Sequence, residues 1–172
     1  MIFLLYLSYR TFNLSNIMQI IIMRHGDAEP LKKNDSTRNL SALGVQQAME
    51  AGKWLNEYYL ASNGIGAALV SPYSRAQQTF EQLNLYVNVG EVQINEDITP
   101  DGNPQLLHDH IDYLLQEKKL KKSLLIVSHM PFVSYLLDEL MSHRESQLFA
   151  TSSLTIIEYP RSKIVEVYHP QF

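Results

Sequence analysis

Three short apolar runs, each followed at once by polar residues, constrain the fold of this chain more than any other feature. They are QIIIM over residues 19–23, AALV over residues 67–70 and SLLIV over residues 123–127. Short continuous apolar runs of this kind are typical of buried strands. Segments with helical spacing of apolar residues lie between them. This alternation predicts an α/β fold of three layers, with a mostly parallel sheet and helices on both faces.

The remaining elements are predicted from cap and turn residues. Ser41 is a suitable N-cap for a helix to about Ala61, because its hydroxyl can accept from the free N–H groups of the first turn. Proline is favourable at the first helical position. Further helices are therefore expected to begin at three prolines: Pro72, with an end near Leu85, Pro104 and Pro131. Further strands are expected at residues 92–94 and, as a hairpin, at residues 154–158 and 163–167.

The first 17 residues contain an apolar run of six residues, from Ile2 to Leu7. A membrane-spanning helix needs roughly 20 apolar residues, and a secretory signal needs basic residues ahead of its apolar stretch. We therefore expect residues 1–17 to be an extension that is not translated in the cell, is disordered, or lies on the surface as an amphipathic piece, with Met18 as initiator. Residues 18–172 are expected to form one domain.

Composition excludes several classes of function. The 14 basic and 18 acidic residues give a net charge of −4, whereas non-specific nucleic-acid binding requires a basic surface. Cysteine is absent, which excludes disulfides, thiolate zinc sites and cysteine nucleophiles. We expect a cytoplasmic monomer that binds neither nucleic acid nor membrane.

Chemistry-bearing residues gather where the three predicted strands end. Arg24 and His25 follow the first strand, Arg75 lies shortly after the second, and His129 follows the third. In open parallel sheets, ligands bind beyond the carboxyl ends of the strands, so these four side chains are expected to converge. Two guanidiniums and two imidazoles, with no obligate carboxylate partner, suit phosphate oxygens.

A metal site built from His25, Asp27 and His129 is the alternative for the same region. We disfavour it because the guanidiniums of Arg24 and Arg75 would repel a cation. No metal and no cofactor is therefore expected.

Three segments resemble motifs of a known family. IIIMRHGDAE resembles the RHG signature of the histidine phosphatase superfamily, which has the phosphoglycerate-mutase-like fold, VSPYSRAQQT resembles its second motif, and VSHMP its third. They occur in family order and cover the chain from Met18 onward. The resemblance is greatest to the small SixA-type phosphohistidine phosphatases, which lack a large cap insertion. NDSTRNLSALG, DITPDGN and FATSSL also resemble that subgroup.

The resemblance implies a metal-independent phosphatase with His25 as the nucleophile. It would form a phosphohistidine intermediate that water then hydrolyses. Arg24, Arg75 and His129 would compensate charge on the equatorial oxygens, which is the main demand of phosphoryl transfer. Arg38 matches a subgroup arginine that would reach the same phosphate, although it could instead be a surface residue near a helix start.

The leaving group separates the remaining alternatives. Broad-specificity members of the superfamily use an acidic residue after the second motif, and Asp97 is the best candidate for that acid here. The surrounding pattern is absent, which favours a phosphohistidine substrate, because an imidazole departs without strong acid assistance. An open, shallow site is expected. The implied partner is a phosphotransfer domain or a phosphotransferase-system carrier.

Two other functions stay open at this stage. One is a phosphomonoesterase that acts on small molecules. The other is a non-catalytic phosphoprotein-binding module on the same fold, although a binder has no need for a nucleophilic His25.

Overall fold

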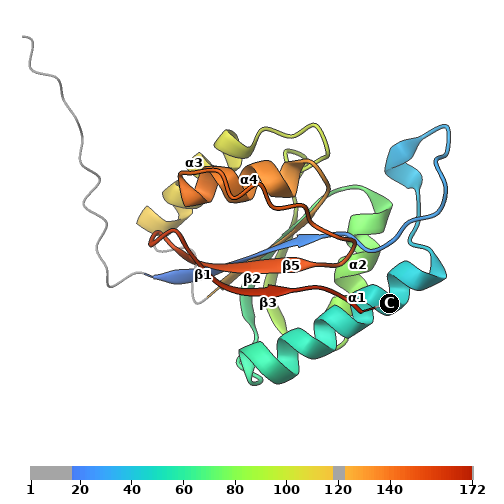
Figure 1. Ribbon diagram of the computed structural model, residues 1–172, viewed down its shortest axis with the longest axis horizontal. Helices are drawn as coiled ribbons and strands as arrows, with labels where there is room; N and C mark the ends of the chain where they lie inside the picture. The colour runs from blue at the N-terminus through green and yellow to red at the C-terminus, as the bar shows by residue number, and fades with distance from the viewer. Residues whose placement is uncertain (1–16, 118–122, 172) are drawn as a thin grey trace, which may run out of the picture.

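The computed structural model describes residues 17–117 and 123–171 (Figure 1). Residues 1–16, which make up almost all of the expected extension, lie outside the described residues. In chain order the elements are β1 (Met18–Arg24), η2 (Asp35–Thr37), α1 (Ala42–Trp54), η3 (Leu55–Leu60), β2 (Ile65–Val70), α2 (Ser74–Asn84), β3 (Val89–Ile94), α3 (Pro104–Gln116), β4 (Ser123–Ser128), α4 (Phe132–Met141), β5 (Leu154–Tyr159) and β6 (Lys163–Tyr168).

The six strands form one sheet in the order β3-β2-β4-β1-β5-β6. The first four strands of that order run parallel to one another. β5 is antiparallel to β1, and β6 is antiparallel to β5. The predicted mostly parallel sheet and C-terminal hairpin are therefore confirmed.

Helices cover both faces of the sheet, and each face has its own apolar core. Alternate residues of a strand point to opposite faces, so Ile20 and Ile22 of β1 join the core beneath α3 and α4, whereas Ile21 and Met23 join the core beneath α1 and α2. All four of these side chains are fully buried. Figure 1 shows α3 and α4 on one side of the sheet and α1 on the other. The three-layer prediction is confirmed.

The start of α2 differs from the prediction. The helix begins at Ser74, two residues after Pro72, and Tyr73 is its N-cap. The Tyr73 carbonyl accepts the N–H groups of Ala76 and Gln77, while the Tyr73 N–H donates to the Ser71 hydroxyl at 3.4 Å. Pro72 therefore belongs to the turn that precedes the helix.

Two other boundaries also differ. α1 ends at Trp54 and continues as the π-helical turn η3, which ends at Ala61 in the left-handed region with φ 45°. The predicted length was thus right, but not the helix type. β3 begins at Val89, earlier than expected, because this edge strand is largely exposed and lacks an apolar run.

Every helix within the described ranges is too short or too polar to span a bilayer.

Candidate active site

The parallel pairing of β1 and β4 brings two of the predicted histidines together. Arg24 lies opposite Ser128 in the register, and the His25 N–H donates to the Ser128 carbonyl at 2.9 Å. The ring centroids of His25 and His129 are 5.0 Å apart. From α2, Arg75 donates through Nε to Nε2 of His25 at 3.1 Å. The convergence predicted from the strand ends is therefore present in the structure.

Hydrogen bonding fixes the tautomer of His25. Its Nδ1 lies 2.7 Å from the Gly26 carbonyl, which can only accept, so Nδ1 carries the proton. Nε2 accepts from Arg75 and therefore carries a lone pair. The ring presents an unprotonated nitrogen toward the cationic side of the site.

His129 is held through its Nε2. Its Nε2 lies 2.7 Å from the Ser71 hydroxyl, which has no other acceptor among the described residues. When the Ser71 hydroxyl donates to Nε2, Nδ1 carries the ring proton. Nδ1 is buried without a hydrogen-bond partner in the described part of the chain. A buried donor left unpaired is costly, and an oxyanion would satisfy it.

Burial and neighbouring cations keep both imidazoles neutral. Burial, together with Arg75, Arg24 and Arg38, lowers the pKa of His25 to about 3, although the Gly26 carbonyl acts in the other direction. Burial, then His25 and the same arginines, lower the pKa of His129 to about 2. Both rings are therefore unprotonated at neutral pH, which is the form that can act as a nucleophile.

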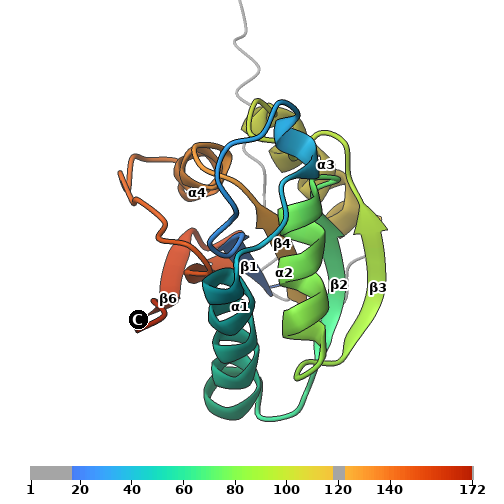
Figure 2. The same ribbon diagram turned by 90° about the vertical axis from the view of Figure 1, so that its right-hand side faces the viewer.

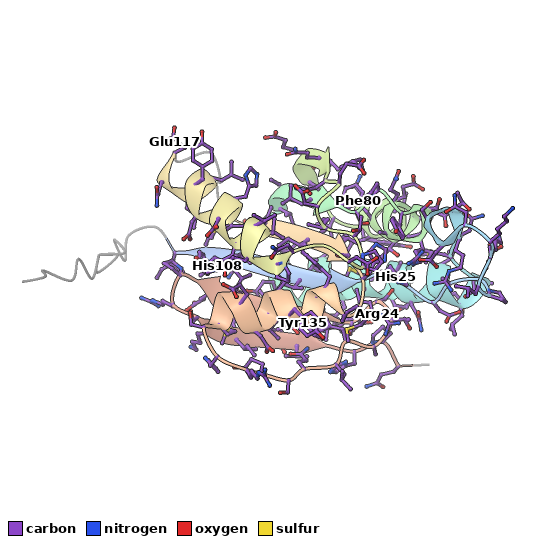
Figure 3. All side chains as sticks on the ribbon, turned by 90° about the horizontal axis from the view of Figure 1, so that it is seen from above. Arg24, His25, Phe80, His108, Glu117 and Tyr135 are labelled. Atoms are coloured by element: carbon purple, nitrogen blue, oxygen red, sulfur yellow. The ribbon has the colours of Figure 1, made fainter. Side chains whose placement is uncertain are left out.

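Arg24 lies beside His25 at the end of β1, as Figure 3 shows. It donates through Nη1 to the Phe149 carbonyl at 2.8 Å, while its Nε is buried without a partner among the described residues. Burial and then the charge of Arg75 lower the Arg24 pKa from its ordinary value. Like Nδ1 of His129, the Arg24 Nε–H is a donor suited to an anion.

The guanidiniums do have a carboxylate partner, contrary to the sequence-based expectation. Asp35, in η2, accepts from Arg75 Nη2 through Oδ2 at 2.9 Å, and its carbonyl accepts from Arg75 Nη1 at 2.7 Å. Its Oδ1 lies 3.0 Å from Nε of Arg38. The expectation was wrong because Asp35 lies in a loop whose course no sequence periodicity defines. The same contact joins Arg38 to the site.

The second motif also anchors the loop after β1. Thr79 accepts the Gly26 N–H through Oγ1 at 3.0 Å, and Gln78 accepts the Leu40 N–H through Oε1 at 2.7 Å. At the start of α1, Gly44 packs so closely that a Cβ there would lie 1.9 Å from the Asp27 carbonyl oxygen. These backbone contacts fix the segment that carries His25.

The predicted cap at the start of α1 is confirmed. Ser41 accepts the Gly44 N–H at 3.1 Å and donates to Asp27 Oδ2 at 2.5 Å. The Asp27 carboxylate is thus engaged with a hydroxyl. The described residues contain no group of three or more histidine, aspartate or glutamate side chains arranged to hold a metal, so His25, Asp27 and His129 form no such set.

Asp97 lies in the exposed turn between β3 and α3. Its N–H donates to the Asn95 side chain at 2.8 Å, and its carboxylate makes no hydrogen bond or ion pair with the described residues. The following residue, Ile98, is buried, and its carbonyl accepts from Ser128 at 2.7 Å. The turn is therefore tied to the end of β4, although the Asp97 side chain is not part of the hydrogen-bonded site.

The site is deeper than the shallow one expected. The exposed fractions are 6% for His25, 3% for Arg75 and 1% for His129. Figure 2 shows why, because the loop between β1 and α1, which carries η2, crosses the face on which the parallel strands end. Through Asp35 that loop covers Arg75.

Sequence reasoning missed Asp35, Ser71 and the Phe149 carbonyl. Ser71 directly follows β2, so its position at a strand end was the available signal. Asp35 lies three residues before Arg38, and an acid so close to a candidate phosphate-binding arginine was a weaker signal. Every residue has a backbone carbonyl, so the sequence could not single out that of Phe149.

Known proteins resemble this chain over most of its length. The sequence profile of the histidine phosphatase superfamily (branch 1) matches residues 20–99. The phosphohistidine phosphatase SixA homolog of Haemophilus influenzae is 36% identical over 157 residues, covering 88% of this chain and 94% of that protein. Phosphohistidine phosphatase SixA of Escherichia coli is 32% identical over 146 residues, covering 84% and 88% respectively. A solved structure of the protein histidine phosphatase SixA with tungstate has a TM-score of 0.79 at 30% identity, covering 87% of this chain and 96% of that one.

Proposed function

This chain belongs to the histidine phosphatase superfamily, and from that premise we propose that it removes phosphate from a phosphorylated histidine on another protein. The relatives that carry the name phosphohistidine phosphatase match most of both chains, which supports the same activity here. The observation that carries the proposal is the unprotonated Nε2 of His25, held beside the Arg75 guanidinium.

The reaction has two steps in this proposal. The lone pair on His25 Nε2 attacks phosphorus, the bond from phosphorus to the substrate imidazole breaks, and its electron pair stays on the departing nitrogen. Water then attacks the phosphoryl group on His25, which releases inorganic phosphate and returns the lone pair to Nε2. His25 needs no separate base, because it is already neutral.

Charge compensation comes from the donors around Nε2. The Arg75 guanidinium, the Arg24 Nε–H and the His129 Nδ1–H would donate to the equatorial oxygens as charge develops there. The last two have no other partner among the described residues, so a bound phosphoryl group would give each of them a hydrogen-bond acceptor. Arg38 contributes charge through its proximity to His25 and His129.

The surroundings of the two candidate carboxylates support a phosphohistidine substrate. An alkoxide leaving group needs a proton from the enzyme, whereas an imidazole can carry its own. The Asp35 carboxylate is paired with two arginines, and the Asp97 carboxylate touches none of the four converging side chains. We keep Asp97 as the candidate acid for any slower cleavage of phosphate esters.

The partner in this proposal is a phosphotransfer domain or a phosphotransferase-system carrier that presents phosphohistidine. Cytoplasmic location, a monomeric state and a domain boundary at Met18 remain predictions.

The deciding experiment compares kcat/KM for a purified phosphohistidine protein and for phosphoserine, in the wild type and in Asp97→Asn. We expect a much higher value for phosphohistidine, and expect Asp97→Asn to lower only the phosphoserine value. Comparable values that both collapse in Asp97→Asn would instead identify a small-molecule phosphomonoesterase. Acid-quenched labelling tests the third alternative, since a binding module would form no phosphorylated His25.

A further inference from the structure

We infer that Asp35 is a positioning residue for Arg75: it holds the far end of the guanidinium so that the remaining N–H groups face the phosphoryl group on its way to His25. The inference rests on the proposed function for its substrate, and on contacts of the described residues for its geometry. Asp35 lies in η2, far from α2 in the sequence, yet three of its oxygens contact arginine side chains.

The contacts of Arg75 divide the guanidinium into two parts. Nη1 and Nη2 donate to the Asp35 carbonyl and carboxylate, whereas Nε donates to His25 Nε2. Arginine has five N–H groups in a rigid plane. Once Asp35 fixes two of them, the plane cannot rotate about its long axis without breaking both bonds. The Nε–H therefore stays at the point of attack, where an oxygen of the phosphoryl group replaces Nε2 as its acceptor once the lone pair attacks phosphorus.

Packing restrains Arg75 but does not replace Asp35. The Tyr73 ring lies beneath the guanidinium, with its centroid 5.0 Å from the Arg75 Cζ. A ring face restricts the guanidinium to a plane but leaves it free to turn within that plane. The two bonds from Asp35 supply the missing restraint.

Asp35 also connects the two arginines through one carboxylate. Its Oδ2 binds Arg75 and its Oδ1 pairs with Arg38. Like charges so close together repel each other, and the carboxylate between them offsets that repulsion. The cost is a negative charge near an anion site, which by itself would weaken phosphate binding. If Asp35 acts by positioning Arg75, removal of its carboxylate should weaken anion binding. If its negative charge dominates, removal should strengthen anion binding.

The test is the variant Asp35→Asn, with tungstate affinity measured by calorimetry and kcat/KM measured on a phosphohistidine protein. Bonds to charged groups of this kind correspond to about a 10- to 100-fold effect, so we expect both quantities to fall by that range. In an Arg75→Ala background the same substitution should change tungstate affinity less than about 2-fold, because Asp35 acts through Arg75.

Glu29→Gln is the matched control. It removes a carboxylate from the same loop, but Glu29 pairs with the exposed Lys32 and not with an arginine of the site. It should leave tungstate affinity and kcat/KM unchanged. If Asp35→Asn fails to fold by circular dichroism, Asp35→Glu keeps the charge and shifts it by one methylene. It therefore tests positioning alone, and tungstate affinity and kcat/KM should still fall.

Tighter tungstate binding in Asp35→Asn would overturn the inference and make Asp35 a mere competitor for the arginines. An equal loss with and without Arg75, or an equal loss in Glu29→Gln, would also overturn it. If the wild type fails to cleave phosphohistidine proteins, the proposed function fails, whereas the tungstate measurements still decide the role of Asp35.

Discussion

The two histidines at the strand ends and the histidine on α3 have opposite kinds of neighbours. His25 and His129 follow the carboxyl ends of the parallel strands β1 and β4. Figure 3 shows His108 on α3, displaced from His25 toward the other end of the sheet. The first two are surrounded by arginines, which lower their pKa values together with burial. His108 instead faces acceptors, with Nδ1 3.0 Å from Glu139 and Nε2 2.8 Å from the Tyr159 hydroxyl.

The difference shows that the partners, and not shielding from water alone, determine what an imidazole can do. Tyr159 donates its hydroxyl hydrogen to Asp112, so its oxygen accepts from His108. Both nitrogens of His108 thus face oxygen atoms. His25 donates from Nδ1 only and keeps the lone pair on Nε2. Of these three histidines, His25 alone has Nε2 directed at an arginine of the site.

The largest effect is expected from His25→Ala, which removes the nitrogen lone pair that the Arg75 Nε–H faces. Turnover of a phosphohistidine protein should be abolished and acid-quenched label should disappear. The circular dichroism spectrum should stay native, because His25 follows β1 and is not part of either apolar core. Substantial hydrolysis in the variant would exclude His25 as the nucleophile.

Arg75→Lys should come next. Lysine keeps the charge but cannot donate to His25 and to both oxygens of Asp35 at once. We expect kcat/KM to fall about 10²-fold or more, by analogy with the loss of one transition-state donor. A rate near that of the wild type would make the Arg75 contacts structural only.

His108→Ala should act on stability and leave catalysis nearly unchanged. The variant leaves Glu139 and the Tyr159 oxygen without their imidazole donor, so the free energy of unfolding should fall by about 1–2 kcal/mol, measured by urea denaturation. His110→Ala, on the same helix, is the control and should change it by less than about 0.5 kcal/mol. A loss of kcat/KM greater than about 2-fold in His108→Ala would break the distinction between the two groups.

The smallest expected change is in the ring resonances of His25 and His129 between pH 7.5 and 5. Because both pKa values are lowered, to about 3 and about 2, these signals should stay constant while a free histidine titrates near 6.5. Assignment comes from His25→Asn and His129→Asn. A midpoint near 6.5 for either ring would contradict the arrangement described above.

The same lowered pKa values predict how stability depends on pH. Between pH 6.5 and about 3, His25 binds a proton in the unfolded chain but not in the folded one. The free energy of unfolding therefore rises with pH across this window, and the folded state loses stability as the pH falls through it. The slope should be shallower in His25→Asn.

Much of the fold was predictable because the core strands are marked by uninterrupted apolar runs. β1 and β4 are buried on both faces, and such strands show no polar alternation. β3 was located less accurately, since an exposed edge strand lacks that signal. The start of α2 was misplaced because the proline rule does not identify which residue after a proline caps the helix.

The site was predictable to the extent that strand ends define it. Arg24, His25 and His129 directly follow core strands, so topology alone brings them together. Asp35 could not be found in this way, because loop residues are positioned by tertiary contacts, here with Arg75 and Arg38. The bond from Arg24 to the Phe149 carbonyl was equally hidden, since any residue supplies a carbonyl.

That bond joins residues 125 positions apart, which bears on how the protein is made. β1 lies between β4 and β5, so this strand, which leads to His25, is made before the other described strands, whereas both of its neighbours are made late. At about 5–20 residues per second, a ribosome needs about 6–25 s to travel from Arg24 to Phe149. For most of that interval, until β4 (Ser123–Ser128) is made, the apolar residues of β1 have no partner strand. Chaperone contact with the nascent chain is thus expected to centre on this segment, and activity to begin only after the hairpin has left the exit tunnel.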